Sequence, residues 1–132
     1  MKSPNILYIM TDQQRFDTIA ALGNRQIHTP NFDRLARRGV AFTNAYTTCP
    51  VCVPARYTLR TGCFEPTTGI YDNGNPQLRA GQAQAMEERC GPYLARVLGR
   101  AGYRTFGIGK FHASPVDEDL GFDFQTRSEE LW

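Results

Sequence analysis

The chain has 132 residues, of which 41% are hydrophobic and 21% charged, and its formal net charge is +2. This length fits one domain of ordinary globular composition, and so mild a positive charge, with arginines spread along the chain, does not indicate a nucleic-acid-binding surface. No apolar run approaches the roughly 18 residues of a membrane span, and no signal peptide is visible, so we expect a cytoplasmic protein, or a periplasmic or secreted one if a leader was removed.

Residues 5–10 form a continuous apolar run, which is typical of a strand covered on both faces in a parallel sheet. Asp12 follows this strand and precedes a loop or short helix over residues 14–22. Ligand sites gather at the carboxyl ends of strands in open α/β sheets, so Asp12 is a candidate ligand residue. On position alone, a cap of the following helix is the better interpretation of Asp12.

The next predicted helix begins with Thr29 as its N-cap and Pro30 at its first position, and Gly39 marks its end. Residues 40–46 are rich in β-branched and aromatic side chains and predict a strand. This strand leads into a segment with two cysteines.

A helix is predicted to run from Cys52 to a glycine stop at Gly62, and Cys49 and Cys52 precede or open it as a C-x-x-C pair. Three interpretations of this pair remain open from the residues alone. It could be a redox dithiol at a helix N-terminus. It could bind zinc, although Cys63 and Cys90 do not supply a second closely spaced pair. It could also consist of buried thiols that pack as small hydrophobes.

Turn residues predict a long loop over residues 63–83. Helical spacing returns at residues 94–101, and a strand follows at 103–108, directly before Lys110 and His112. Residues 114–132 show no closing element. The alternation of strands and helices predicts an α/β fold with parallel strands.

The segment from Cys52 to Arg56 matches the pattern C-x-P-x-R, and with it the chain resembles the sulfatase family of the alkaline-phosphatase-like superfamily. Four further segments are similar to family motifs in the same order: residues 9–15, 29–39, 59–62 and 101–112. The resemblance implies an alkaline-phosphatase-like three-layer αβα sandwich with a mostly parallel sheet. It also implies that residues 1–132 are the N-terminal part of a sulfatase catalytic domain, truncated at the C-terminus. We therefore expect the segment alone to be inactive, because the family's later metal ligands, second histidine and second lysine have no counterpart.

The resemblance assigns catalytic roles to four residues. Cys52 is expected to be oxidised to formylglycine by a formylglycine-generating enzyme or an anaerobic maturase, and the hydrate of this aldehyde is the nucleophile. Arg56 orients the hydrate. Lys110 binds a sulfate oxygen. His112 hydrogen-bonds the nucleophile and helps the sulfated intermediate to collapse by taking its proton. Two residues apart in an extended segment, Lys110 and His112 are expected to project from the same side; without the motif, both would be read as surface residues.

The resemblance also implies a metal site formed by Asp12, Gln13 and the modified Cys52. These oxygen ligands suit calcium, with magnesium or manganese as alternatives. Gln13 stands where many relatives carry a second aspartate, so its amide brings no charge. Asn73 is a loose match to a substrate-binding asparagine of some relatives; as part of an Asn-Gly sequence it is equally explained as a turn residue.

The implied function is hydrolysis of a small-molecule or saccharide sulfate ester. Cleavage of phosphonate or phosphodiester substrates is the neighbouring alternative, because the Asp12-Gln13 form also resembles phosphonate monoester hydrolases. A non-catalytic remnant that binds sulfated ligands is a second alternative. A dithiol oxidoreductase that uses Cys49 and Cys52 is a distant third.

Overall fold

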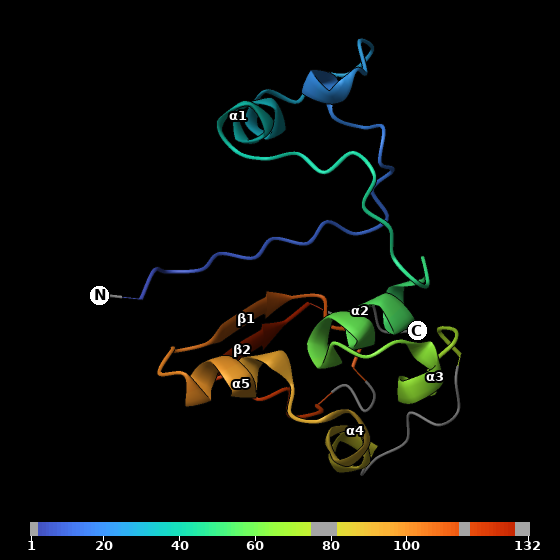
Figure 1. Ribbon diagram of the computed structural model, residues 1–132, viewed down its shortest axis with the longest axis vertical. Coiled ribbons are helices and arrows are strands. Elements are labelled where there is room, and N and C mark those ends of the chain that lie inside the picture. The colour runs from blue at the N-terminus through green and yellow to red at the C-terminus, as the bar shows by residue number, and fades with distance from the viewer. Residues whose placement is uncertain (1–2, 75–81, 114–116, 129–132) are drawn as a thin grey trace. The chain divides into compact units, whose positions relative to one another are not determined.

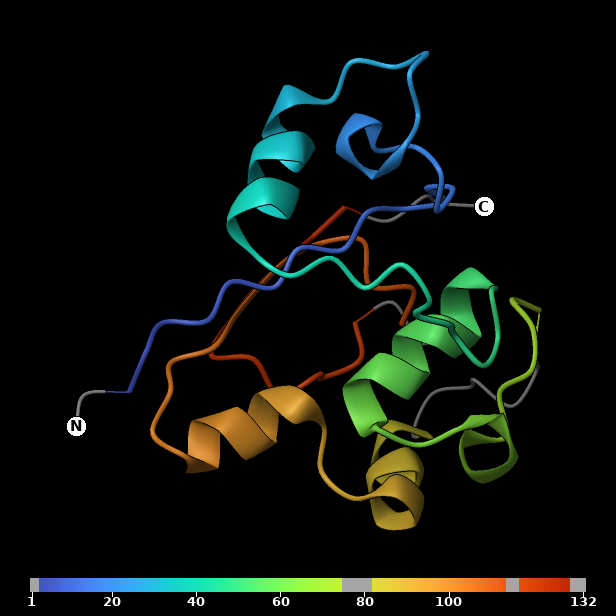
Figure 2. The same ribbon diagram turned by 45° about the horizontal axis from the view of Figure 1, so that its top comes forward.

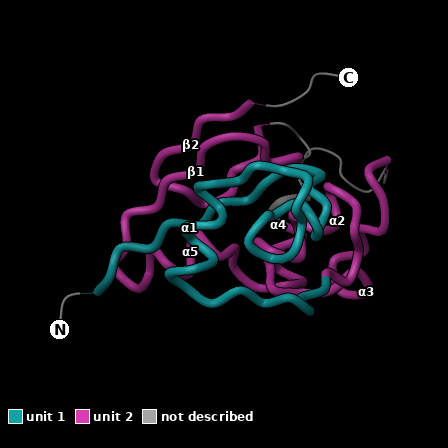
Figure 3. The backbone as a smooth tube through the Cα atoms, turned by 90° about the horizontal axis from the view of Figure 1, so that it is seen from above, with its two compact units in different colours: residues 1–46 teal, residues 47–132 magenta. Residues whose placement is uncertain are grey.

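The computed structural model describes residues 3–74, 82–113 and 117–128. Contacts divide the chain into two compact units, residues 1–46 (unit 1) and residues 47–132 (unit 2), which are coloured separately in Figure 3. Over the described ranges, no helix is long and apolar enough to cross a membrane.

Unit 1 contains a short 3-10 helix, η1 (Ala20–Leu22), and an α-helix, α1 (Pro30–Arg38), which confirms the predicted helix with proline at its first position. Thr29 occupies the N-cap position, but its hydroxyl does not cap the helix. Instead it accepts a hydrogen bond of 2.8 Å from the backbone N–H of Ala20 and donates one of 2.8 Å to Asp33. The first of these bonds joins η1 to α1, and so does the hydrogen bond of 2.9 Å that the backbone N–H of Ala21 donates to Asp33.

The two strands predicted in unit 1, at residues 5–10 and 40–46, are wrong: neither segment is assigned to a strand. Their apolar side chains are exposed, to 84% at Leu7 and 80% at Phe42. A β-strand exists only where a neighbouring strand satisfies its backbone N–H and C=O groups. An apolar pattern predicts an extended conformation but supplies no partner.

The predicted nucleophile helix, α2, lies beside α3 in unit 2 (Figures 1 and 2). Helix α2 packs against α3 and α5, and α3 packs against α4. In chain order the elements are α2 (Cys52–Thr61), α3 (Glu65–Thr68), α4 (Gln82–Cys90), α5 (Leu94–Arg100), β1 (Phe106–Gly109) and β2 (Phe124–Arg127).

Strands β1 and β2 pair in parallel, with Phe106 opposite Phe124 and Gly109 opposite Arg127. This pairing confirms the predicted α/β class with parallel strands. Strand β1 is shorter than the predicted strand at residues 103–108. Strand β2 falls in a region for which no closing element was predicted, so that expectation is wrong.

The predicted loop over residues 63–83 is also only partly correct. Helix α3 lies inside it, and α4 begins at its end; residues 75–81 lie outside the described part. Helix α3 was missed because it has only four residues. Helix α4 carries few apolar side chains, which leaves little helical periodicity to detect.

The hydrophobic core of unit 2 is formed by residues of α2 and α4, Ile70 after α3, Tyr93 at the start of α5, and two residues between β1 and β2. Complete burial of an aliphatic side chain such as Ile70 or Leu120, each 1% exposed, contributes about 1.5–3 kcal/mol to folding. The core contains Val53, Tyr57, Ile70, Met86, Tyr93, Ala113 and Leu120. Because the core packs one side of α2, it fixes the helix that begins at Cys52.

Candidate active site

Cys52 is the first residue of α2 and is half-buried. Val51 precedes it in an extended conformation, and Pro54 lies in the first turn, where a missing backbone N–H loses no helical hydrogen bond. Gly62 ends the helix in a left-handed conformation (φ 70°), and its N–H binds the carbonyl of Thr58. The helix from Cys52 to the Gly62 stop was therefore predicted correctly.

Asn73 approaches the N-terminus of this helix from a turn 20 residues further along the chain. Its side-chain oxygen accepts a hydrogen bond of 3.0 Å from the backbone N–H of Val53. The N–H groups of a helix's first turn have no partner within the helix, so Asn73 supplies a cap that Val51 cannot. This contact brings Asn73 to the residue next to Cys52.

Arg56 lies one turn after Cys52 and is 9% exposed. Its Nη1 donates a hydrogen bond to the backbone carbonyl of Lys110. The predicted catalytic residues thus lie on two segments that touch: α2 carries Cys52 and Arg56, and the segment after β1 carries Lys110 and His112. Lys110 and His112 are both half-buried.

The prediction that Lys110 and His112 project from one side assumed an extended segment, and the backbone departs from that conformation at both ends of the segment. Strand β1 ends at Gly109 with a φ of 112°, and His112 has a φ of 49°. A strand alternates its side chains only while its backbone stays extended. The positive φ at each end of the segment interrupts that alternation.

Close packing holds this segment against the sheet. The rings of Phe111 and Phe122 lie 5.8 Å apart in an edge-to-face arrangement. Gly107 makes this possible, because a Cβ at that position would lie 2.8 Å from Cζ of Phe111 and 2.9 Å from Cδ2 of Phe122.

Asp12 and Gln13, the predicted metal ligands, form an exposed bend in unit 1. Asp12 does not cap the following helix, since η1 begins at Ala20 with Ile19 as its N-cap. The carboxylate and amide oxygens of Asp12 and Gln13 are suited in kind to a hard divalent cation. Within the described ranges, no group of three or more His, Cys, Asp or Glu side chains is arranged to hold a metal ion.

Gln13 and His112 share an unusual backbone conformation. They are the two non-glycine residues with a positive φ, 49° in each case, among the residues that the structure describes. Side chains other than glycine rarely adopt this conformation, and where they do the strain often accompanies a functional site. Both residues are members of the predicted site.

The remaining cysteines have separate environments. Cys49 is a free thiol whose Sγ donates to the carbonyl of Tyr71 at 3.7 Å. The Sγ of Cys63 donates to the carbonyl of Cys90 at 3.7 Å. Burial, together with the neighbouring Cys63 thiol, raises the pKa of Cys90.

Sequence reasoning missed Arg60, which follows Arg56 by one helical turn. Its Nη2 donates to the carbonyl of Phe111, the residue after Lys110. The available signal was the four-residue spacing of the two arginines, which places both on one face of α2. The contact itself joins residues 51 positions apart and could not be read from that spacing.

Comparison with known proteins gives a consistent result. A family model described as "Sulfatase" matches residues 4–130. The chain is 36% identical over 129 residues to an ulvan-active sulfatase of Formosa agariphila, covering 92% of this chain and 23% of that protein. It is 36% identical over 119 residues to an arylsulfatase of Clostridium perfringens (90% and 23%) and over 120 residues to a choline-sulfatase of Rhizobium meliloti (91% and 22%). The chain thus spans under a quarter of the length of these relatives.

Proposed function

The chain belongs to the sulfatase family, and from this membership we propose that its protein hydrolyses sulfate esters with a nucleophile made from Cys52. The observation that carries the proposal is the hydrogen bond from Arg56 to the carbonyl of Lys110. It joins the helix that begins at Cys52 to the segment that contains Lys110 and His112. The four residues to which we assign catalytic roles, Cys52, Arg56, Lys110 and His112, all belong to unit 2.

The chemistry explains why these residue types are needed. A sulfate ester is an anion, and negative charge shifts between its oxygens as the ester bond breaks. Cys52, oxidised to the aldehyde and hydrated, supplies the oxygen that attacks sulfur. Lys110 offsets the charge on the sulfate oxygens as a point charge. The bond between sulfur and the ester oxygen breaks, and the departing alkoxide takes up the proton lost by the attacking hydroxyl, so that it leaves as the alcohol. His112 then takes the proton of the second hydrate oxygen as sulfate departs and the aldehyde returns.

The proposed metal ligands are Asp12 and Gln13 in unit 1, with the modified Cys52. A bound divalent cation, calcium by preference for oxygen ligands, would supply positive charge beside the sulfate group. Since Gln13 is neutral, Asp12 carries the negative charge that these two adjacent residues offer such an ion.

The substrate we propose is a sulfated saccharide or small alcohol. The names of the relatives support this range, because they include an ulvan-active sulfatase, an N-acetylgalactosamine-6-O-sulfatase and a choline-sulfatase. The further partner is the maturation enzyme that would oxidise Cys52.

The test is peptide mass spectrometry on the full-length natural protein, produced together with a formylglycine-generating enzyme. The tryptic peptide that spans residues 39–56 contains both Cys49 and Cys52, so fragmentation assigns any oxidation to one of them. We expect the aldehyde at Cys52 and a thiol at Cys49. Hydrolysis of an aryl sulfate by protein whose Cys52 is entirely thiol would contradict the proposed nucleophile.

A matched pair of variants separates this proposal from dithiol chemistry. Cys49→Ser should retain aryl sulfate hydrolysis, whereas Cys52→Ala should reduce kcat/KM to about one thousandth or less, as removal of a nucleophile does in other hydrolases. An oxidoreductase would require both cysteines. A phosphonate monoester assayed alongside tests the neighbouring activity.

A further inference from the structure

Arg60 is a half-buried residue whose guanidinium the proposed chemistry leaves without a role. It lies on α2, and burial lowers its pKa, although the nearby Tyr57 and Glu118 favour its charged form. Its Nη1 is fully buried and has no hydrogen-bond partner among the described residues. Such a group is expensive to bury, and an apolar side chain of similar size would commonly stabilise a protein as well or better. Stability alone therefore does not account for an arginine here.

What Arg60 does contact is the candidate active site. Its Nη2 donates to the carbonyl of Phe111, while Arg56 donates to the carbonyl of Lys110. Two guanidinium groups on one face of α2 thus hold two consecutive carbonyls. One attachment would leave the segment free to rotate about it, whereas two fix both its position and its direction. This matters because the segment ends in the left-handed conformation of His112, which must be held in place.

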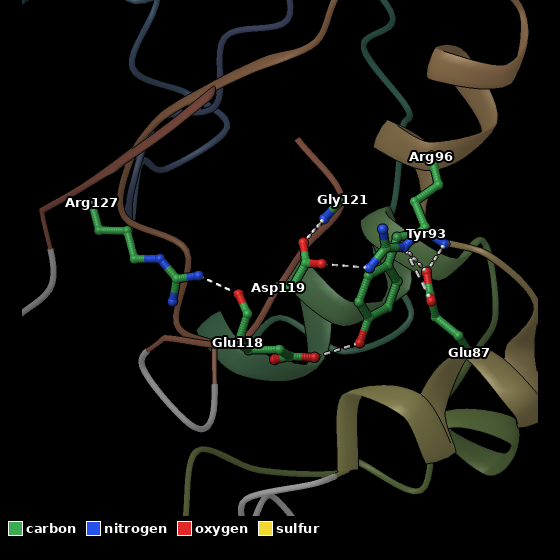
Figure 4. A network of polar contacts seen from close by, with 7 residues as sticks. All are labelled: Glu87, Tyr93, Arg96, Glu118, Asp119, Gly121 and Arg127. Carbon is green, nitrogen blue, oxygen red and sulfur yellow. Dashed lines mark hydrogen bonds and ion pairs between the residues drawn. The ribbon is translucent and has the colours of Figure 1, made fainter. Parts of the chain in front are cut away.

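A buried network on the other side of Arg60 fixes the guanidinium itself. The guanidinium carbon lies 4.4 Å from the centre of the Tyr57 ring, a cation–π distance. The hydroxyls of Tyr57 and Tyr93 donate to the two carboxylate oxygens of Glu118, each at 2.6 Å. Figure 4 shows Glu118 between Tyr93 and Arg127, which donates to the Glu118 backbone carbonyl. With both its hydroxyl and its place in the core fixed, the Tyr57 ring offers Arg60 a rigid surface.

We propose that Arg60 is a positioning residue of the active site, which holds the Lys110–His112 segment against the helix that begins at Cys52. In this role Arg60 touches neither substrate nor nucleophile. It holds the carbonyl of Phe111 and thereby positions the side chains of Lys110 and His112, the residues on either side of Phe111. This inference rests on the proposed function for its consequence in catalysis, but the restraint itself is measurable without activity.

The test uses full-length protein with Arg60→Met, which keeps the length and apolar character of the side chain, and Arg60→Lys, which keeps one donor. Arg100→Met is the matched control, because Arg100 is an exposed arginine at the end of α5. Trypsin cleavage after Lys110 reports on the segment, and cleavage after the exposed Arg38 is the internal reference.

We expect Arg60→Met to speed cleavage after Lys110 by about tenfold, as for loss of one charge-assisted hydrogen bond, with cleavage after Arg38 unchanged. Arg60→Lys should recover most of the protection, and Arg100→Met should match the parent. An unchanged rate after Lys110 in Arg60→Met would overturn the proposal. So would equal acceleration at every site with a lowered melting temperature, since Arg60 would then serve only overall stability.

Kinetics on an aryl sulfate then link the restraint to catalysis. In Arg60→Met, kcat/KM should fall by about tenfold or more, in step with the loss of protection, because misplacement of a catalytic group by a fraction of an ångström has effects of this size. Unchanged kinetics in a variant that has lost protection would overturn the catalytic part. If the parent protein itself shows no sulfatase activity, the proposed function fails, while the proteolysis result still decides whether Arg60 holds the segment.

Discussion

Glu118 is a carboxylate enclosed by protein, with 4% of its surface exposed. Each of its side-chain oxygens accepts a hydrogen bond from a tyrosine, Tyr57 on one side and Tyr93 on the other. The pKa of Tyr93 lies well above its ordinary value. Burial disfavours the charged tyrosinate, and so does the adjacent Glu118, which accepts a hydrogen bond from the neutral hydroxyl. The two tyrosine hydroxyls therefore supply one hydrogen bond to each of the two oxygens of the Glu118 carboxylate.

Exchange of that acceptor should be costly. Glu118→Gln replaces one carboxylate oxygen by an amide nitrogen, which cannot accept a hydrogen bond from a tyrosine hydroxyl. We expect the free energy of unfolding to fall by about 1–3 kcal/mol, the usual effect of one buried polar group left unsatisfied. Urea denaturation measures it. The exposed neighbour Asp117 provides the control, and a loss from Asp117→Asn as large as that from Glu118→Gln would contradict the explanation.

The raised pKa of the Cys90 thiol can be tested by its reactivity. Because burial and the Cys63 thiol raise the pKa of Cys90, its reactive thiolate is scarcer at any given pH than that of an unperturbed cysteine. Iodoacetamide should therefore alkylate Cys90 more slowly than an ordinary cysteine in an unfolded peptide at pH 8, and the half-maximal pH of its rate should be higher. Mass spectrometry at timed intervals gives both. In Cys63→Ser, that half-maximal pH should move down, and no movement would exclude Cys63 as a cause.

Single residues were predictable from the sequence where a local pattern marks them. Cys52 and Arg56 follow from the C-x-P-x-R spacing, and the structure places them on one helix. Arg60 and Glu118 did not stand out, because their contacts join residues 51 and 61 positions apart. Spacing along a helix says which side chains share a face, but it does not say what lies opposite that face.

At the scale of elements, the predicted helices are those with strong start and stop residues. Helix α2 has Pro54 in its first turn and Gly62 at its end, and α5 falls between Pro92 and Gly102. Strand β2 gave no such signal. It has four residues, and it is stabilised by pairing with β1 and by Asp123, which accepts hydrogen bonds from the backbone N–H and the hydroxyl of Thr105. Contacts of this kind exist only once the chain is folded.

Two glycines in similar surroundings should respond in opposite directions to the same substitution. A Cβ at Gly62 or at Gly99 would meet nothing within 4 Å, so neither change is opposed by packing. Gly62 has a φ of 70° at the end of α2, where alanine is disfavoured by about 1–2 kcal/mol. Gly99 lies inside α5, where alanine should stabilise by about 0.5–1 kcal/mol.

Urea denaturation of Gly62→Ala and Gly99→Ala measures both signs in one experiment. A lower midpoint for the first and a higher midpoint for the second are expected, with equal slopes. Two shifts of the same sign would show that the left-handed conformation at Gly62 does not decide its effect.

At the scale of the whole molecule, the sequence predicted the α/β class and the parallel direction of its strands, and it failed on the strands of unit 1. Residues 5–10 and 40–46 are apolar enough for buried strands, yet no described residue of unit 1 is classed as buried. Burial and pairing are properties of the folded neighbourhood rather than of the segment. The prediction of the proposed metal ligands is affected in the same way: Asp12 follows a predicted strand end that is not formed as a strand.

Several carboxylates of unit 2 share one electrostatic feature, a pKa lowered by hydrogen bonds. The pKa of Asp119 is lowered from its ordinary 3.8, first by the hydrogen bond from the backbone N–H of Gly121 and second by the hydrogen bond from Arg96. The backbone N–H and hydroxyl of Thr105 lower the pKa of Asp123 from the same value. The folded state thus binds a proton less readily than the unfolded chain at both sites.

These lowered pKa values determine the direction in which pH changes the stability of unit 2. A carboxylate whose pKa is lower when folded contributes stability that is fully present above its unfolded pKa, about 3.9, and that is lost as pH falls through the folded value. We therefore expect the urea midpoint to stay level with respect to these groups from pH 7 to about pH 5 and to decline below about pH 4. Added salt should reduce the part of this pH-dependent stability that comes from the exposed Arg96–Asp119 ion pair.

A pair of variants tests the contribution of Asp123. Asp123→Asn removes the titrating group but keeps an acceptor for Thr105, so it should lower the urea midpoint at pH 7 and flatten the decline at low pH. The exposed Asp117→Asn should leave both the midpoint and the decline unchanged. A decline as steep in Asp123→Asn as in the parent would mean that Asp123 does not couple stability to pH.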